Sequence, residues 1–577
     1  MKFDDILLEI GEFGRYQRWV YTMVIITSIP VAFHQMAQVF LAGASDHWCE
    51  VASWQDYDCE ANGLSDADCA DLKRNASSPM NGTEDQLQCY KYEVVDEMEF
   101  HPGLNPTSYN DTTLIECNDG WVYDKSQYKS SIIQDFNLVC DDANLDSLAQ
   151  SLYFVGVLVG SLLFGALSDI IGRRYTLFIA LFGQCTVGVG IAFSPSYWVF
   201  TSLRMVLAGA NMGVFLLCFI IGTEFVGPSK RTFAGMGINL AFSVGYMIIA
   251  VYAYFIRDWW ILQLVITVPS FLLFFFYPFI PESARWLISK GRTEAATKVV
   301  EKAATVNKAT LPDPIFTDEE IKEQEIALKA KQATALDLFK TRNLRLRTLN
   351  CMFNWFVNTL VYYGLSLSTS DLGVNDYVAF FISGGVEIPA IISGMFAIEY
   401  IGRKWSTFGY MVFGGVACLC TIFTPLGAWR TTVAMLGKFG IAASFAIIYV
   451  YSAELFPTPV RSVGVGICSM SARIAGILAP IILLLAETWE PLPVLIFGIA
   501  SIAAGLLILF LPETLGQRLP ETIEEGELFG TSKAKEKEYE LNTVSSSVDK
   551  KEHAYQENGN GAVNKGFVDD STSTEKV

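Results

Sequence analysis

Long apolar blocks dominate this chain and limit what it can fold into. Three clear ones cover residues 20–31, 147–168 and 493–511. A bilayer core needs about 20 apolar residues per helix, and helices of soluble domains rarely run that long without charge. The sequence therefore predicts an integral membrane protein. Residues 1–18 carry acids and are followed by no small-residue cleavage site, so we expect a retained first helix rather than a signal peptide.

The apolar blocks fall into two groups of six. We expect helices near 19–43, 147–168, 174–193, 197–222, 232–255 and 259–280, and near 348–369, 376–400, 404–423, 430–452, 462–486 and 490–511. The predicted fold class is an all-α membrane protein with twelve transmembrane helices in two six-helix halves, 19–280 and 348–511. The charged stretch 281–347 is predicted to be a cytoplasmic linker with short surface helices, and the polar stretch 512–577 a disordered cytoplasmic tail.

A large polar loop, 44–146, separates the first two predicted helices. It contains 22 Asp and Glu against 5 Lys and Arg, which is nearly all of the excess behind the net charge of −19. It also contains half of the twelve cysteines, namely Cys49, Cys59, Cys69, Cys89, Cys117 and Cys140. Three disulfides are expected, with fifteen connectivities open; zinc ligation is a weaker alternative because no close CxxC pair occurs.

The same loop carries three N-glycosylation sequons, at Asn75, Asn81 and Asn110. Sequons clustered with cysteines indicate an oxidising, extracellular location. If the loop is outside, both chain termini are cytoplasmic, and the charges agree. Short loops on the cytoplasmic side carry Arg173, Arg174, Lys230, Arg231, Arg403, Lys404 and Arg461, whereas short outer loops carry only Arg257 and Arg430. This bias predicts a multi-pass plasma-membrane protein in that orientation.

An internal repeat follows the second helix of each half. The first copy is GALSDIIGRR at 165–174 and the second is EYIGRK at 399–404. An acidic residue, a Gly turn and two basic residues in matching places indicate duplication, and they predict a charged latch between helix ends. The latch residues expected are Asp169, Arg173, Arg174, Glu399 and Arg403, together with Glu224, Glu454 and Arg461. Anchoring by positive charge alone is the alternative.

Three further motifs follow the sixth, tenth and twelfth helices: PESARWLISKGR (281–292), AELFPTPVR (453–461) and LPETLGQRLPETIEE (511–525). With the cysteine-bearing loop, they resemble the major facilitator superfamily and, within it, solute carrier family 22, most closely the invertebrate organic cation transporter-like branch. The resemblance covers roughly residues 1–530. It implies a transporter of organic ions. Sugar porters share some of these motifs, but they lack the long sequon-rich loop and have a Gln-Gln and Asn cluster in helix seven that this chain lacks.

Few ionisable residues lie within the predicted spans, and each is a functional candidate because a buried charge in a membrane is costly. They are Arg204, Glu387, Lys438 and Arg473. In cation carriers of the resembled family the position of Arg473 holds an aspartate, and in anion and carnitine carriers an arginine. Arg473 is therefore expected to bind a substrate carboxylate. A structural ion pair with Glu387 is the alternative.

Aromatic residues recur at helical spacing in two of the predicted spans. Trp355 and Tyr362 share one face, and Phe215 and Phe219 share another. Packing alone explains many such stripes, but the resemblance places Phe215, Phe219, Trp355, Tyr362 and Lys438 at cavity positions. Rings around a cavity would hold an ammonium group by cation–π attraction. Arginine and aromatic rings together predict a zwitterion, such as a betaine-like or carnitine-like amine.

The sequence thus predicts a transporter of small organic cations or zwitterions that works by alternating access. Its partners are the substrate and the lipid bilayer, and sodium or proton coupling is left open. An organic anion exchanger of the same fold and a non-transporting receptor that presents the loop are the alternatives. No nucleophile–base pair, metal cluster or Walker loop is evident, so no enzyme activity and no cofactor are expected. The chain has no basic patch with interleaved aromatics, which argues against nucleic-acid binding.

Overall fold

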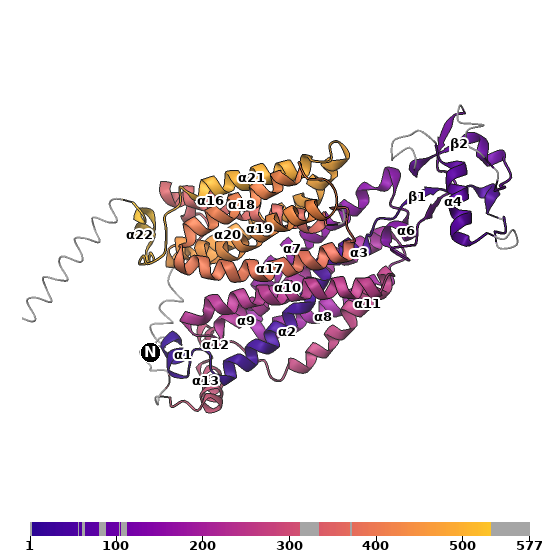
Figure 1. Cartoon of the computed structure of the whole chain (residues 1–577). Helices are drawn as coiled ribbons and strands as arrows, with labels where there is room; N and C mark the ends of the chain where they lie inside the picture. The colour runs from indigo at the N-terminus through magenta and orange to yellow at the C-terminus, as the bar shows by residue number, and fades with distance from the viewer. Residues whose placement is uncertain are drawn as a thin grey trace, which may run out of the picture.

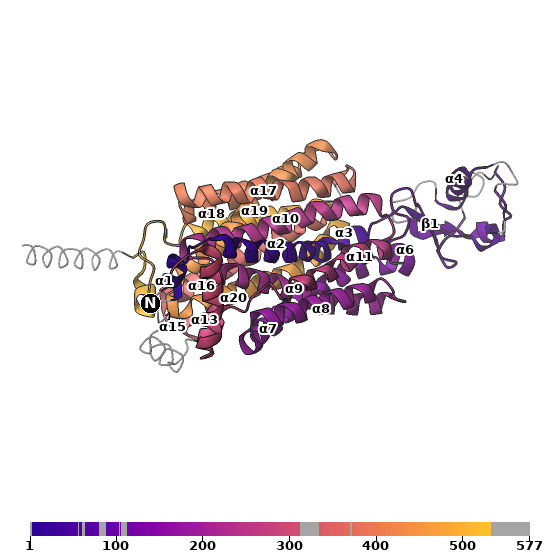
Figure 2. The same ribbon diagram turned by 90° about the horizontal axis from the view of Figure 1, so that it is seen from below.

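The computed structural model describes residues 3–55, 57–59, 64–79, 88–102, 104, 112–311, 315, 334–369 and 372–531. Within these ranges the chain forms two bundles of long helices that lie side by side, with a small domain projecting from one end (Figures 1 and 2). We call that end the loop-domain end and the opposite one the latch end. The latch end carries α1 (Phe3–Glu9) and the helices that connect the bundles.

The first bundle contains six long helical segments. They are α2 (Arg15–Met36), α7 (Asn144–Ile171), α8 (Arg173–Ile191), α9 (Tyr197–Glu224), α10 (Arg231–Phe255) and α11 (Trp259–Thr267), which runs on as a 3-10 helix over Val268–Phe276. Pro269 stands at the second position of that 3-10 segment. Because proline lacks the N–H that an α-helix needs, the change of helix type occurs there. A short helix, α3 (Gln38–Leu41), continues the line of α2.

The second bundle repeats this plan. It contains α16 (Arg342–Leu367), α17 (Asp376–Tyr400), α18 (Arg403–Thr421), α19 (Ala428–Leu455), α20 (Arg461–Leu483) and α21 (Leu492–Ile508). Nine helical segments of the described chain are long and apolar enough to cross a membrane. The other three are α16 and α18, which are more polar, and α21, which has 17 residues. All three pack inside the second bundle, as the predicted twelve-helix arrangement requires.

The linker contains short helices, and the start of the tail, which was expected to be disordered, folds against the second bundle. Three short helices, α12 (Ala284–Ser289), α13 (Thr293–Asn307) and α15 (Asp337–Lys340), lie at the latch end. After α21 the chain turns back, and α22 (Ile523–Leu528) contacts the start of α16, where Glu527 accepts hydrogen bonds from the backbone N–H of Asn343 and Leu344. Residues 312–314 and 316–333 of the linker and residues 532–577 of the expected tail lie outside the described residues.

The loop domain contains two small antiparallel sheets and a helix. Strand β1 (His47–Cys49) pairs with β4 (Trp121–Tyr123), and β2 (Tyr90–Tyr92) with β3 (Leu114–Glu116). The helix, α4, spans Asp66–Ser77. Its apolar core is small, so disulfides are needed to restrict the unfolded chain. They join Cys49 to Cys117, Cys59 to Cys69 and Cys89 to Cys140.

All six cysteines predicted for disulfides are therefore paired. His47 lies beside Cys89 and Cys140, but a disulfide leaves those two sulfurs without the thiolates that zinc requires. A buried lysine completes the domain: Lys91 donates to Asp96 at 2.5 Å and to Asp119 at 2.6 Å. The Lys91 ammonium lowers the pKa of the Asp119 carboxyl below its usual value. The domain thus replaces a large core with covalent and ionic contacts.

The segment 126–128, which we call the stem of the loop domain, joins the two bundles. Gln127 Nε2 and Tyr128 Oη donate to the Asp376 carboxylate at the start of α17, at 2.6 and 2.9 Å. Arg257, which follows α10 in the first bundle, donates to the carbonyl oxygen of Ser126 at 3.1 Å. Ring stacking of Phe40 on Tyr377 adds an apolar contact nearby. The two bundles are therefore tied together at the loop-domain end.

One sequon can be located in the structure. Asn75 is exposed on α4, whereas Asn81 and Asn110 lie outside the described residues. We expect the protein made in animal cells to migrate faster on a gel after glycosidase treatment, because each glycan adds mass. Replacing all three asparagines with glutamine should abolish that shift. A shift of undiminished size in the triple variant would overturn the assignment of the sequons.

Candidate functional site

A cavity lies between the two bundles. Four helices of each bundle line it: α2, α7, α9 and α10 from the first, and α16, α17, α19 and α20 from the second. Its polar lining residues are Gln35, Asn239, Thr359, Tyr362, Tyr363, Glu387, Tyr449, Ser469 and Arg473, and its aromatic hydrocarbon surface comes from Phe154, Phe215, Phe242 and Phe445. Such a cavity, mostly apolar with a few polar groups, is typical of a small-molecule site.

Arg473 supplies the one charge in this cavity that has no oppositely charged partner among the described residues. Its guanidinium donates to the carbonyl oxygen of Ser469 at 2.5 Å and to the hydroxyl of the same residue. A second nitrogen lies 3.9 Å from the Met212 sulfur, and Nε is buried without an acceptor. Several donor positions therefore remain for an anionic group. Arg473 does not form the ion pair with Glu387 that was the alternative interpretation.

Glu387 is instead paired with Lys438. The two side chains are almost fully buried, and Lys438 Nζ lies 3.2 Å from the carboxylate. Tyr362 Oη donates to the same carboxylate at 2.6 Å and Ser243 Oγ at 2.7 Å. Lys438 also donates to Ser366 Oγ, and its Nζ lies 3.6 Å from the centre of the Tyr362 ring. Since Ser243 belongs to α10, this cluster connects the two bundles.

The aromatic rings are arranged differently from the prediction. Tyr362 lines the cavity and stacks on Phe445 at 5.8 Å between ring centres, and Phe445 meets Tyr449 at 5.5 Å. Trp355 is fully buried behind Tyr449, at 4.3 Å, and donates its indole N–H to Ser452. Phe215 lines the opposite wall, whereas Phe219 and Lys438 are outside the cavity surface. Two of the predicted rings, Tyr362 and Phe215, therefore line the cavity, whereas Trp355 and Phe219 do not, and Phe445 lines it without having been predicted.

Arg204 lies away from the cavity. Its side chain is fully buried in the first bundle, 3.5 Å from Gln150 Oε1 and 4.9 Å from the centre of the Tyr153 ring. Contacts of this kind hold α9 against α7. Of the four charged residues found in the predicted spans, the structure thus brings Glu387, Lys438 and Arg473 to the cavity or its wall and leaves Arg204 within the packing of one bundle.

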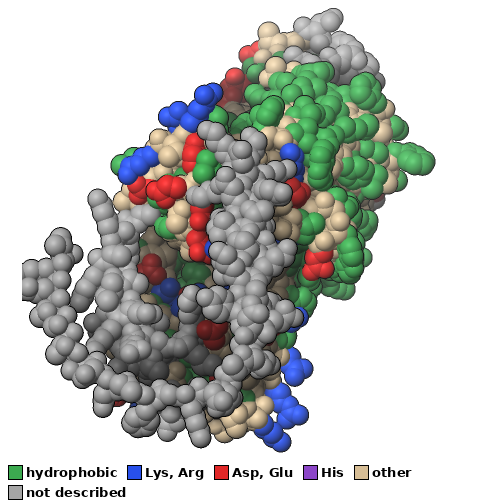
Figure 3. Space-filling view, turned by 90° about the vertical axis from the view of Figure 1, so that its left-hand side faces the viewer, with side chains coloured by type: hydrophobic (Ala, Val, Ile, Leu, Met, Phe, Trp, Pro, Cys, Tyr) green, Lys and Arg blue, Asp and Glu red, His purple; other side chains and the backbone are tan. Residues whose placement is uncertain are grey.

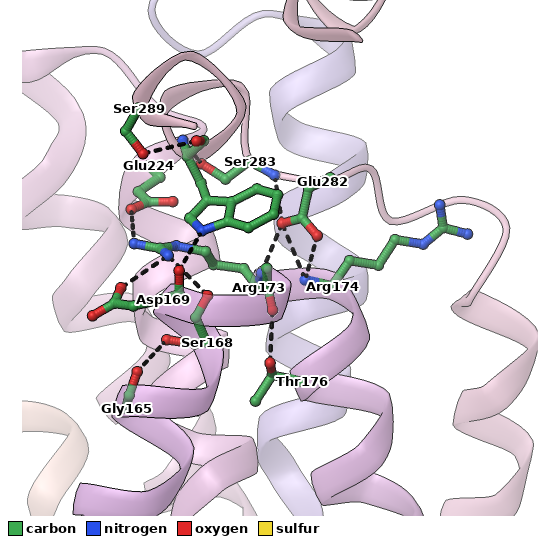
Figure 4. A network of polar contacts seen from close by, with 12 residues as sticks. Gly165, Ser168, Asp169, Arg173, Arg174, Thr176, Glu224, Glu282, Ser283 and Ser289 are labelled. Atoms are coloured by element: carbon green, nitrogen blue, oxygen red, sulfur yellow. Dashed lines mark hydrogen bonds and ion pairs between the residues drawn. The ribbon is translucent and has the colours of Figure 1, made fainter. Parts of the chain in front are cut away.

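Figure 4 shows the latch of the first bundle. Arg173 lies at the start of α8 and contacts Asp169 at 3.0 Å and Glu224, at the end of α9, at 3.5 Å. Glu282 accepts hydrogen bonds from the backbone N–H groups of Arg173 and Arg174. These groups are the unsatisfied donors at a helix start, where a carboxylate is favoured. The latch therefore connects α8, α9 and the segment before α12.

The second bundle contains a matching latch. Arg403 at the start of α18 contacts Glu454 at the end of α19 at 2.9 Å. Glu513 accepts from the backbone N–H groups of Arg403 and Lys404. Glu399 departs from the expected latch: it is exposed and forms no ion pair in the described part of the chain. Arg461 likewise forms no ion pair there and donates to the carbonyl oxygen of Phe456.

Two latch residues, Glu282 and Glu513, were missed. Each stands in a short repeat that the sequence contains, Pro-Glu-Ser at 281–283 and Pro-Glu-Thr at 512–514, directly after the last helix of its bundle. Gly172 and Gly402, with φ of 105° and 100°, precede the capped helices. L side chains rarely adopt these φ values, which is why glycine is favoured at both positions, and a Cβ there would also displace the glutamate oxygen, 2.4 and 2.6 Å away.

We expect Glu282→Ala to lower the maximal transport rate strongly while surface expression is retained. The substitution leaves the first N–H groups of α8 without an acceptor, which costs about 0.5–2 kcal/mol in comparable helix caps. Initial rates at saturating substrate, normalised to surface protein, measure the effect. Glu399→Gln is the matched control and should transport like wild type. Equal losses in the two variants would contradict the role given to Glu282.

Comparisons with known proteins agree with this architecture. Residues 107–525 match the family model "Sugar (and other) transporter". The chain is 43% identical to the organic cation transporter protein of Drosophila melanogaster, over 92% of this chain and 96% of that protein. It is 38% identical to human solute carrier family 22 member 13 and 35% identical to human organic cation/carnitine transporter 2, each over 91% of this chain and 93% of the relative.

Solved structures support the fold alone, because their identities are low. The xylose transporter XylE from E. coli superposes with a TM-score of 0.56 at 15% identity, covering 87% of this chain and all of XylE. The human organic anion transporter MFSD10 gives 0.50 at 14% identity, covering 85% of this chain and 99% of that protein. The chain therefore belongs to the major facilitator superfamily and, within it, to solute carrier family 22, and it is a membrane transporter rather than an enzyme.

Proposed function

We propose that the chain carries small organic cations and zwitterions, in particular carnitine-like or betaine-like amines, across the plasma membrane. The observation that carries the proposal is the cavity between the bundles. The Arg473 guanidinium on α20 lines it without an acidic partner among the described residues, and stacked aromatic rings on α16 and α19 line it next to Glu387. The cavity therefore offers one group for a carboxylate and others for an ammonium.

The carboxylate end is assigned to Arg473. A guanidinium has five N–H donors in a planar fork and binds a carboxylate through two parallel hydrogen bonds. Ser469 occupies only part of these donors. Because the cavity lies between helices of both bundles, the local dielectric constant is lower than at an exposed surface and the attraction is stronger.

The ammonium end is assigned to the rings of Tyr362, Phe445 and Tyr449, with Phe215 facing them from the other bundle. A ring face attracts an ammonium by about 0.5–2 kcal/mol. The Glu387 carboxylate adds negative potential, although Lys438 neutralises most of it. The Drosophila and human relatives are named for organic cations and carnitine, which supports the same substrate class.

The proposal includes an orientation and alternating access. The loop domain lies outside and both termini lie in the cytoplasm, which is supported by the disulfides and by the arginines at the latch end. Charged side chains gather around the latch end, and a hydrophobic surface covers the adjoining flank (Figure 3). The stem contacts through Gln127, Tyr128 and Asp376 join the bundles on the outer side. Outward opening requires these contacts to break.

One observation favours an organic anion exchanger as a second candidate. Glu387 and Lys438 neutralise each other, so Arg473 leaves the cavity with a net positive charge. A substrate with a carboxylate and no ammonium would satisfy Arg473 equally well. The aromatic rings, which favour a cation over an anion, are the reason to rank the zwitterion first.

An uptake panel tests the proposal. Cells expressing the chain would receive radiolabelled carnitine, tetraethylammonium and an aromatic monocarboxylate, with and without sodium and at neutral and mildly acidic external pH. Saturable uptake of carnitine, exceeding that of the carboxylate, is the expected result. Uptake of the carboxylate alone would establish the exchanger, and surface expression without saturable flux of any compound would leave the receptor alternative.

A further inference from the structure

A second pocket lies at the latch end of the first bundle. Its walls come from the start of α8, the chain after the 3-10 segment Val268–Phe276, α12 and one face of α13. It shares no lining residue with the cavity between the bundles.

Four basic side chains line this pocket: Arg174, Arg292, Lys298 and Lys302. Lys298 and Lys302 are one helical turn apart on α13, so both ammonium groups point to the same side. Neither forms an ion pair within the described ranges, and both are exposed. The one acidic residue in the lining, Glu282, is already engaged by the backbone N–H groups of Arg173 and Arg174. The pocket therefore has an excess of positive charge and favours an anion.

The opposite part of the pocket is aromatic and faces the flank of the bundle. Tyr175 and Phe279 line it and are 52% and 45% exposed. Leu272 and Phe275, which precede Phe279 in the same stretch, are 64% and 72% exposed, and a contiguous apolar patch of this kind marks a lipid-facing or binding surface. Aromatic residues of this kind mark the boundary between hydrocarbon and water on a transmembrane bundle. The pocket thus opens both to lipid and to a basic helix.

We propose that this pocket binds an anionic phospholipid, with its phosphate groups at Lys298, Lys302 and Arg174 and its acyl chains along Tyr175 and Phe279. Basic pockets beside transmembrane helices suit phosphate-bearing headgroups, and the cytoplasmic leaflet is the one rich in anionic lipids. That leaflet matches the orientation proposed above. A soluble phosphate compound has the same charge but lacks the chains that the aromatic wall would cover.

A lipid in this pocket lies beside the latch. Glu282 lines the pocket and also caps α8, and Trp286, which lines it too, donates its indole N–H to the carbonyl oxygen of Asp169 at 3.1 Å. The occupied pocket would therefore hold α12 and the start of α8 together.

The test uses the full-length protein purified in a neutral detergent. Binding of dioctanoyl phosphatidylinositol bisphosphate would be measured beside dioctanoyl phosphatidylcholine and soluble inositol trisphosphate. Wild type should bind the anionic lipid saturably and the other two compounds much more weakly. In Lys298→Gln/Lys302→Gln the affinity should fall about 30-fold, because each lysine near an anionic headgroup raises the affinity about fivefold.

The matched control is Lys290→Gln/Lys308→Gln, which removes the same charge from the same segment but outside the pocket lining. It should bind like wild type. Melting temperatures without lipid verify that both double variants are folded, and single Lys302→Gln gives an intermediate affinity. Equal weakening in the two double variants, or full affinity in the first, overturns the site. Equal affinity for inositol trisphosphate overturns the assignment to a lipid.

Discussion

Arg473→Ala is expected to reduce uptake of a carnitine-like zwitterion by at least about 30-fold relative to uptake of a tetraalkylammonium ion. Removing the guanidinium leaves the substrate carboxylate unpaired in an enclosed cavity, and the truncation of such a buried charge pair costs about 2–5 kcal/mol. A tetraalkylammonium ion has no carboxylate that could be left unpaired, and the substitution removes the repulsion between its charge and that of Arg473. The measurement is the ratio of the two uptake rates, normalised to surface protein.

Two further variants make this result interpretable. Arg473→Lys keeps the positive charge but loses the planar fork, so we expect an intermediate ratio. Arg430→Ala removes an arginine from the same bundle whose partner, Glu490, is mostly exposed, and it should leave the ratio unchanged. If Arg473→Ala lowers uptake of both compounds equally, Arg473 has a structural role and the preference for a zwitterion is lost.

Lys438→Met is expected to destabilise the protein by about 3–5 kcal/mol, because it removes one partner of a buried ion pair and leaves the other charge uncompensated. Glu387 would retain only Tyr362 and Ser243 as donors. Thermal unfolding of the purified protein and the fraction that reaches the surface measure the loss. Glu387→Gln should have a similar effect, since it leaves the Lys438 ammonium unpaired.

The double variant Glu387→Gln/Lys438→Met separates stability from transport. Both charges are gone, so melting temperature and surface expression should recover most of the loss. Uptake of organic cations should stay low if Glu387 supplies negative potential to the site. Lys340→Met is the control, because Lys340 pairs with Asp337 at the surface and its loss should change stability little. Recovery of both stability and cation uptake in the double variant would make the pair purely structural.

Much of the architecture is determined by the sequence alone. Apolar blocks of membrane-spanning length impose helices, since a backbone in hydrocarbon must satisfy its own hydrogen bonds. The cysteines and sequons between 44 and 146 similarly indicated a disulfide-bonded outer domain, and the repeat around Arg173 and Arg403 indicated two related halves. These features are local, because each depends on composition or spacing within a short stretch. They can therefore be predicted without knowledge of the fold.

The tertiary structure decided which side chains meet. Glu387 pairs with Lys438 rather than Arg473, and Trp355 lies behind Tyr449 instead of facing the cavity. Helical periodicity gives the face of a helix, but the neighbour on that face depends on how helices far apart in sequence pack. The disulfide connectivity and the capping of α8 by Glu282 have the same cause. The pairing of charges is therefore what the sequence alone determines least, because it arises only when distant segments are brought together.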